Sequence, residues 1–125
     1  MIIDTDVLIW YMRGNEKARE TIYERIPFDI SVVTYMEIVQ GMRNKEELKI
    51  LLKYLKKRGV RIIQTDEQIS IRAMFLVEDY SLSHSMELAD ALIAGTVLEN
   101  QEELLTGNGE RYRYIPNLQI EEFRP

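Results

Sequence analysis

The sequence predicts an α/β fold with a parallel sheet, and three observations support that prediction. Short apolar segments without polar alternation recur along the 125-residue chain, as in strands buried on both faces. Longer segments between them carry apolar residues at helical spacing. Polar side chains follow several of the predicted strands, and in such sheets ligands bind outside the carboxyl ends of the strands. A chain of this length is expected to form one domain over residues 1–125.

Composition excludes several kinds of site. The chain has no cysteine, so it forms no disulfide, thiolate nucleophile or thiolate metal site. Its single histidine, His84, excludes a mechanism with two imidazoles and is expected in a loop. No apolar run could span a bilayer and no signal segment opens the chain, so we expect a cytoplasmic protein without a membrane partner. The net charge of -5 opposes non-specific binding of polyanions but permits a local basic strip.

The first predicted strand, Ile2–Ile3, leads directly into Asp4. A helix is predicted to follow through Tyr11, so Asp4 stands at the junction between strand and helix. A carboxylate at such a junction either caps the helix or joins a cation in a ligand site. From this segment alone, both roles are open for Asp4 and for Asp6.

The middle of the chain continues the alternation of helix and strand. Asn15 fits the N-cap of a helix that stops before Pro27. A buried strand is predicted over residues 28–33, and another over residues 60–63. Residues 45–58 predict an amphipathic helix with leucines on one face and lysines on the other. Exposure to solvent is the commoner reason for such a basic face, and contact with RNA is the alternative.

A short helix is predicted over residues 34–40, and Gly41 ends it. Thr34 and Glu37 fit a capping box, in which the Glu37 side chain would accept a hydrogen bond from the Thr34 amide. Glu37 also stands early in a helix that follows a strand, where it could face a ligand site. The capping box is therefore the structural alternative to a functional Glu37.

The C-terminal half is predicted to contain a helix capped by Asp66, a buried helix over residues 87–99, and strands at 104–105 and 118–120. The helix over 87–99 is apolar on nearly every side, yet it contains Asp90. Burying an unpaired carboxylate is costly, and no Lys or Arg lies within one turn of Asp90. We expect a metal ion to satisfy it, and a hydrogen bond from a distant Ser, Thr or backbone amide is the alternative.

Four of these polar residues are expected to converge. The carboxyl ends of parallel strands meet at one edge of the sheet, which would bring together Asp4, Glu37, Asp90 and, after the fourth strand, Asn108. Clustered carboxylates repel one another unless a cation offsets their charge. Mg²⁺ and Mn²⁺ prefer such oxygen ligands, so a divalent metal is the expected cofactor.

Taken in order, these segments resemble the PIN-domain nucleases, and most closely the VapC toxins of toxin–antitoxin pairs. The matching segments are residues 3–9, 31–37 with Gly41, 88–94, 105–108 and the tail 115–118. The resemblance implies a three-layer α/β/α sandwich whose central parallel sheet has the strand order 3-2-1-4-5. It also implies a Mg²⁺- or Mn²⁺-dependent endoribonuclease, with RNA as substrate, a basic antitoxin protein as partner and a homodimeric assembly.

The resemblance assigns roles to individual residues. Asp4, Glu37 and Asp90 match the three acidic positions of the family and are the predicted metal ligands and catalytic residues. Asn108, which stands where many members have Asp, is the fourth predicted catalytic residue. Thr5 and Thr34 are candidates for positioning water or ligand, with helix capping as the alternative for each.

Arg111 departs from the family pattern. It stands where a further Asp or His is common, so the fourth acidic contribution is open, with Glu87 or Glu110 as candidates. Arg111 and Arg113 are close in sequence to the expected site and are candidates to contact the RNA backbone.

Two other functions are compatible with parts of the pattern. Asp4 and Asp6 fit the first motif of haloacid-dehalogenase-like phosphatases, as nucleophile and acid/base. Those enzymes also need a later Lys and a closely spaced acidic pair after another strand, whereas Asp90 lies inside a buried helix. A catalytically inactive PIN-like binding module is the second alternative, and Arg111 is its only support.

Overall fold

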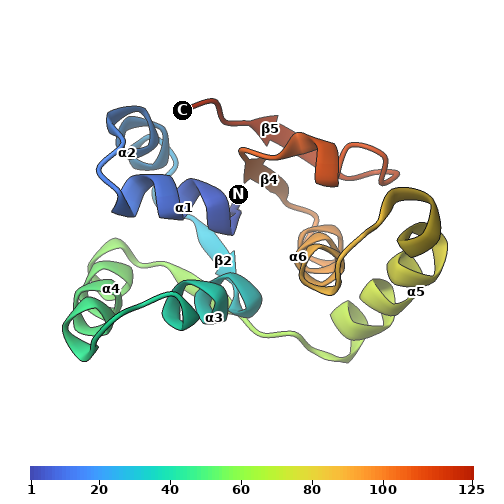
Figure 1. The fold of residues 1–125 in the computed structure, drawn as a ribbon, viewed down its shortest axis with the longest axis horizontal. Helices are drawn as coiled ribbons and strands as arrows, with labels where there is room; N and C mark the ends of the chain where they lie inside the picture. Colours follow the sequence, from blue (N-terminus) through green and yellow to red (C-terminus); the bar gives the residue numbers. More distant parts are fainter.

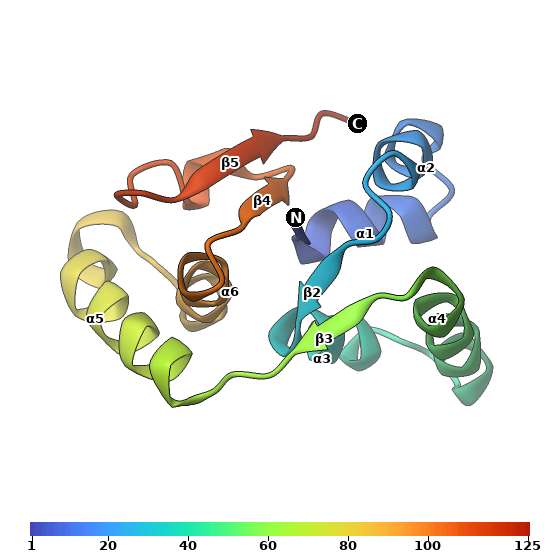
Figure 2. The same ribbon diagram turned by 180° about the vertical axis from the view of Figure 1, so that it is seen from behind.

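A computed structural model describes residues 1–125 as a five-stranded sheet with helices on both faces (Figure 1, Figure 2). All neighbouring strands pair in parallel, in the order β3-β2-β1-β4-β5. The strands are β1 (Ile2–Ile3), β2 (Asp29–Ser31), β3 (Arg61–Ile63), β4 (Glu103–Thr106) and β5 (Gln119–Glu122). The predicted α/β/α sandwich and its strand order are confirmed.

Two apolar cores, one on each face of the sheet, hold the layers together. Ile2 and Leu104 belong to the core shared with α5 and α6, whereas Ile3 and Leu105 belong to the core shared with α1, α2 and α4. Successive side chains of a strand point to opposite faces, so β1 and β4 each contribute to both cores. Double-sided burial explains why the strand segments show no polar alternation.

The helices lie on either side of this sheet (Figure 1). They are α1 (Thr5–Met12), α2 (Glu16–Tyr23), α3 (Val32–Gln40), α4 (Lys45–Arg58), α5 (Glu67–His84) and α6 (Leu88–Glu99), with a short 3-10 turn, η1 (Gly109–Arg111). The predicted caps Asn15 and Asp66 accept hydrogen bonds from the amides of Ala18 at 2.8 Å and Ile69 at 2.9 Å. None of the helices combines the length and apolar character that crossing a membrane requires.

The junction between β2 and α3 differs from the prediction. The predicted strand over 28–33 ends at Ser31, and α3 begins at Val32 instead of Thr34. The Ser31 side chain accepts a hydrogen bond from the Val33 amide at 3.0 Å and caps the helix there. A cap and tertiary packing thus outweigh the strand propensity of two valines. Thr34 lies inside the helix, so the capping box that was the structural alternative for Glu37 does not form.

His84 also differs from its predicted place in a loop. It is the last residue of α5, and its ring stacks on that of Tyr114 with the ring centroids 4.0 Å apart. Tyr80, one helical turn earlier, packs edge-on against the Tyr114 ring at 5.0 Å. These aromatic contacts fasten the segment after η1 to the end of α5.

Candidate active site

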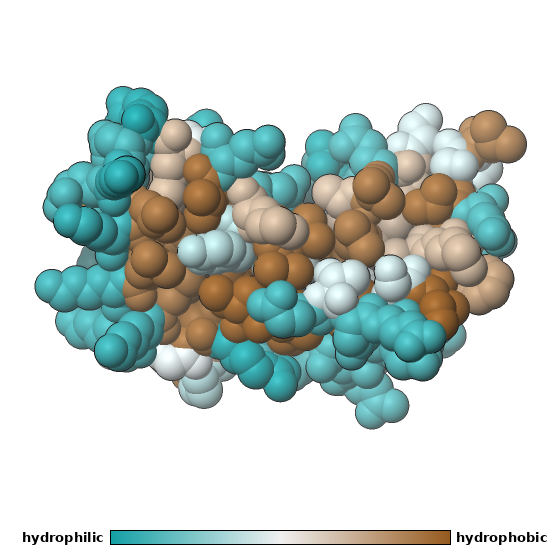
Figure 3. Space-filling model, turned by 90° about the horizontal axis from the view of Figure 1, so that it is seen from below, coloured by the Kyte–Doolittle hydropathy of each residue, from teal (hydrophilic) through white to brown (hydrophobic).

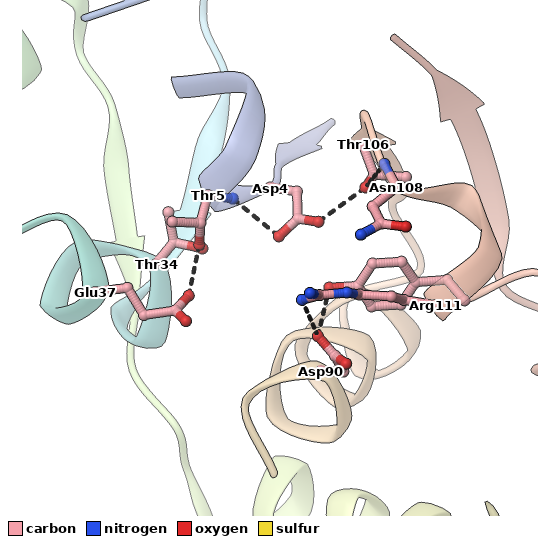
Figure 4. Close-up of polar contacts among 9 residues, drawn as sticks. Asp4, Thr5, Thr34, Glu37, Asp90, Thr106, Asn108 and Arg111 are labelled. Carbon is pink, nitrogen blue, oxygen red and sulfur yellow. Dashed lines mark hydrogen bonds and ion pairs between the residues drawn. The ribbon is translucent and has the colours of Figure 1, made fainter. Parts of the chain in front are cut away.

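A polar pocket of about 210 Å³ opens beside the carboxyl ends of β1 and β4 (Figure 4). Its lining residues come from α1, α3, α6 and the segment that follows β4: Asp4, Thr5, Asp6, Ile9, Glu37, Asp90, Ile93, Asn108 and Arg111. The four predicted catalytic residues are all among them. The fold therefore brings these residues together, and their roles in metal binding and catalysis stay predictions.

Asp4 both caps α1 and faces the pocket. One carboxylate oxygen accepts a hydrogen bond from the Thr5 amide at 2.8 Å, and the other accepts one from the Thr106 hydroxyl at 2.8 Å. Only 6% of Asp4 is exposed. Burial, followed by repulsion from Asp6, raises the pKa of Asp4 to about 6, although these hydrogen bonds oppose the change. Both roles that the sequence left open are thus compatible with the geometry.

Asp6 is the pocket residue that sequence reasoning undervalued. Its Oδ1 atom is buried and has no hydrogen-bond partner. Burial raises the pKa of Asp6, while the nearby Gly107 amide partly offsets this effect. A Cβ atom at position 107 would lie 2.6 Å from Asp6 Oδ2, so a larger residue there would displace this carboxylate. The unpartnered oxygen makes Asp6 a further candidate ligand.

Glu37 reaches the pocket from α3, where α1 anchors it. The Thr5 hydroxyl donates a hydrogen bond to Glu37 Oε1 at 2.7 Å, and the Thr34 hydroxyl lies 3.0 Å from the Thr5 hydroxyl. Thr5 thus contacts Glu37 directly and Thr34 contacts Thr5, while their predicted role toward water or ligand stays a prediction. The structural partner of Glu37 is therefore the Thr5 hydroxyl and not the Thr34 amide.

Asp90 has a partner that the sequence analysis did not consider. Its Oδ1 atom lies 3.4 Å from the Arg111 guanidinium and 3.5 Å from the Tyr112 hydroxyl (Figure 4). Arg111 comes 21 residues later in the chain, so a search for cations within one helical turn misses it. Burial raises the pKa of Asp90, and the positive charge of Arg111 partly offsets this effect.

The kinds of residue that line the pocket suit a divalent cation. Four carboxylates and the side-chain amide of Asn108 provide hard oxygen donors of the kind that Mg²⁺ and Mn²⁺ prefer, and the orphaned Asp6 oxygen is one of them. No three acidic or histidine side chains are grouped closely enough to hold one ion in this structure. The Arg111 guanidinium points into the space that Asp4 and Asp90 face (Figure 4).

The remaining candidates lie around this pocket or outside it. The backbone amide of Asn108 donates a hydrogen bond to the Thr106 hydroxyl at 3.0 Å, which links the loop after β4 to Asp4. Glu87 and Glu110 are exposed and do not line the pocket. Asp6 is thus the fourth acidic residue there.

Arg113, proposed with Arg111 as an RNA contact, does not line the pocket either and pairs with Glu122. The two arginines differ because η1 turns Arg111 toward α6 and leaves Arg113 beside β5.

Comparisons with known proteins identify the family and agree with the fold. A family model described as PIN domain matches residues 1–117. A comparison with curated proteins gave no match. Three similar solved structures are a toxin–antitoxin complex from Klebsiella pneumoniae (25% identity, TM-score 0.76, 98% of each chain covered), a DNA-bound VapBC from Salmonella typhimurium (21%, 0.82, 97% of this chain and 96% of that one) and FitAcB from Neisseria gonorrhoeae (20%, 0.68, 95% and 94%).

Proposed function

The chain belongs to the PIN-domain family, and on that basis we propose that it is a metal-dependent endoribonuclease, the toxin of a VapBC-type toxin–antitoxin pair. PIN domains are typically nucleases. The observation that carries the proposal is the convergence of Asp4, Glu37 and Asp90, from three separate segments, on one pocket. The substrate is RNA, and hydrolysis of a phosphodiester bond is the reaction.

In this mechanism Asp4 and Asp90 would hold Mg²⁺ or Mn²⁺, and Glu37 would share it directly or through water. When bound, the ion lowers the pKa of a water molecule and polarises the phosphoryl group. Thr5 fixes Glu37 by donating to Oε1, which leaves Oε2 available for that task. Thr106 holds Asp4 from the opposite side. The Asn108 side chain provides an amide donor for a phosphate oxygen, since it lines the same pocket.

The antitoxin partner is supported by a groove that ends at the catalytic pocket. An apolar cleft of about 530 Å³ lies between α1, α2, α3 and α4, and Met12 and Ile50 on it are 48% and 65% exposed. A second hollow shares Met12 with this cleft and shares Ile9 and Glu37 with the catalytic pocket. A partner segment bound along this path would bury an apolar face and place a basic residue among the carboxylates.

A homodimer is the assembly we propose for the toxin itself. Apolar side chains on α3, α5 and α6 are more than half exposed: Met36 at 53%, Phe75 at 52% and Leu88 at 69%. Figure 3 views the molecule from below the orientation of Figure 1. On this face apolar side chains gather across the middle and polar side chains surround them. Apolar patches of this kind are common at protein interfaces.

The phosphatase alternative gains no supporting observation, whereas the contact of Arg111 with Asp90 fits an inactive binding module. A haloacid-dehalogenase-like phosphatase would need a lysine beside Asp4 and Asp6, and no lysine lines the pocket. An inactive binding module would not require the carboxylates to converge on one pocket. The enzymatic assay below distinguishes both from the nuclease.

The test is cleavage of single-stranded RNA with Mg²⁺ or Mn²⁺, with and without a chelator. Asp90→Asn is expected to abolish cleavage and retain the fold, because it removes one carboxylate charge without changing the size of the side chain. Asp66→Asn is the matched control, since Asp66 caps α5 outside the pocket and Asn caps equally well. Cleavage that survives the chelator, or that survives Asp90→Asn, would refute the proposed mechanism.

A further inference from the structure

Arg111 is the only positively charged residue that lines the catalytic pocket. Its guanidinium lies 3.4 Å from Asp90 Oδ1 and also in the electrostatic field of Glu87 and Asp4. The Arg111 side chain is 51% exposed, whereas that of Asp90 is 8% exposed. A half-exposed cation thus partners a buried carboxylate.

The contact between these two residues is weak for an arginine–carboxylate pair. Arginine has five donors and often binds carboxylates through two parallel hydrogen bonds. Here one nitrogen approaches one oxygen at a long distance, and the Tyr112 hydroxyl lies 3.5 Å from the same oxygen. A single long contact to a half-exposed side chain is readily exchanged for a stronger ligand.

The backbone of Arg111, by contrast, is held in place. Its amide donates to the Asn108 carbonyl at 3.1 Å, and the next residue, Tyr112, is 1% exposed. If the side chain leaves Asp90, the guanidinium therefore remains at the edge of the pocket. A guanidinium in that position matches the oxygens of a phosphate group.

We propose that Arg111 is a displaceable substitute for the divalent cation: it pairs with Asp90 in the metal-free protein, competes with the ion for that carboxylate, and binds the RNA phosphate once displaced. The proposal rests on the proposed function. It makes Arg111 a substrate-binding residue that lowers the affinity for metal and raises the rate of cleavage.

The experiment compares Arg111→Met with Arg113→Met, which removes the same charge two residues away. Arg113 pairs with Glu122 and does not line the pocket, so it controls for long-range electrostatics. Titration calorimetry with Mn²⁺ is expected to show a dissociation constant about fivefold lower for Arg111→Met, the size expected for loss of one partly exposed ion pair. Arg113→Met is expected to bind Mn²⁺ like the unmodified protein.

RNA cleavage across a Mn²⁺ series gives the second measurement. Arg111→Met is expected to reach its half-maximal rate at lower Mn²⁺ and to have a maximal rate reduced about tenfold or more, since the phosphate loses a charged partner. Arg111→Lys, which keeps the charge, should recover part of the maximal rate. Thermal unfolding of each variant checks that the fold is retained.

Several outcomes would overturn the inference. Equal Mn²⁺ affinity in Arg111→Met and the unmodified protein excludes competition between Arg111 and the ion. An equal gain of Mn²⁺ affinity in Arg111→Met and Arg113→Met would show that the change in net charge, and not the contact with Asp90, causes the gain. An undiminished maximal rate in Arg111→Met excludes the phosphate contact. Mn²⁺ binding that depends on Asp90 but not on Arg111 refutes this inference alone. Absence of Mn²⁺ binding in every protein refutes the proposed function as well.

Discussion

Replacing Asp4 by asparagine should stabilise the metal-free protein at neutral pH while abolishing its activity. Burial and repulsion from Asp6 raise the pKa of Asp4 from 3.8 to about 6, so the folded state disfavours the charged carboxylate. At roughly 1.36 kcal/mol per pH unit, the full shift corresponds to about 3 kcal/mol of destabilisation once Asp4 is ionised. An asparagine side chain carries no charge, still offers an acceptor for the Thr5 amide, and is a favoured N-cap.

The raised pKa of Asp4 also predicts how the free energy of unfolding changes with pH. Between pH 3.8 and about 6, folded Asp4 binds a proton that the unfolded chain has already lost. Stability therefore falls as pH rises through this window, and the whole cost is present above the folded-state pKa. We expect Asp4→Asn to gain about 1–3 kcal/mol at about pH 7.5, because part of the effect is lost with the Thr106 hydrogen bond. Near about pH 4 the gain should vanish.

Urea unfolding in the presence of a chelator, at about pH 4 and about pH 7.5, measures both quantities. Asp66→Asn is again the control, since this exposed cap should change stability little at either pH. Added Mn²⁺ should narrow the difference at the higher pH, because only the unmodified protein gains stability from the ion. If Asp4→Asn is no more stable than the unmodified protein at the higher pH without metal, burial does not raise the pKa of Asp4 as described.

Three further predictions follow from the same geometry. Glu37→Gln should weaken Mn²⁺ binding in calorimetry while metal-free stability stays equal or rises, because carboxylate repulsion is relieved; unchanged binding would return Glu37 to a structural role. Gly107→Ala should lose activity and about 1–3 kcal/mol of stability in urea unfolding, because its Cβ would lie 2.6 Å from Asp6 Oδ2, whereas Gly41→Ala meets nothing closer than 3.6 Å and should behave normally. A basic antitoxin co-purified with the chain should inhibit RNA cleavage, less so at high Mn²⁺ or after its inserted Arg is changed to Ala; a complex that cuts RNA as fast as the free protein would refute the toxin assignment and leave the nuclease intact.

Much of the fold is predictable from short stretches of sequence. The caps Asn15 and Asp66 act on amides three residues away, so the signal for where those helices begin is local. The signal for a strand buried on both faces is local too, because such a strand is a short run of consecutive apolar residues. The error at Ser31 shows the limit, because Val32 and Val33 suit a strand and only the cap and the surrounding packing make them helical.

Three of the four carboxylates that line the pocket were named from the sequence, and the groups that they contact were not. Asp90 can be recognised from its own helix, because an ionisable residue among apolar ones is costly to bury. Its contact with Arg111 depends on where η1 lies relative to α6, which no local pattern encodes. The burial of Asp6 likewise depends on the approach of Gly107 from the loop after β4.

The sequence by itself thus determined the alternation of helices and strands and marked Asp90 as a costly buried carboxylate, because periodicity, capping and burial cost act between residues close along the chain. The resemblance to the PIN-domain family, and not a local pattern, singled out Asp4 and Glu37. The tertiary structure alone decided which groups meet them. Thr106 reaches Asp4 across 102 residues, because β4 pairs directly with β1 in the sheet. Contacts of that kind are set by strand order, and strand order is a property of the whole packed chain.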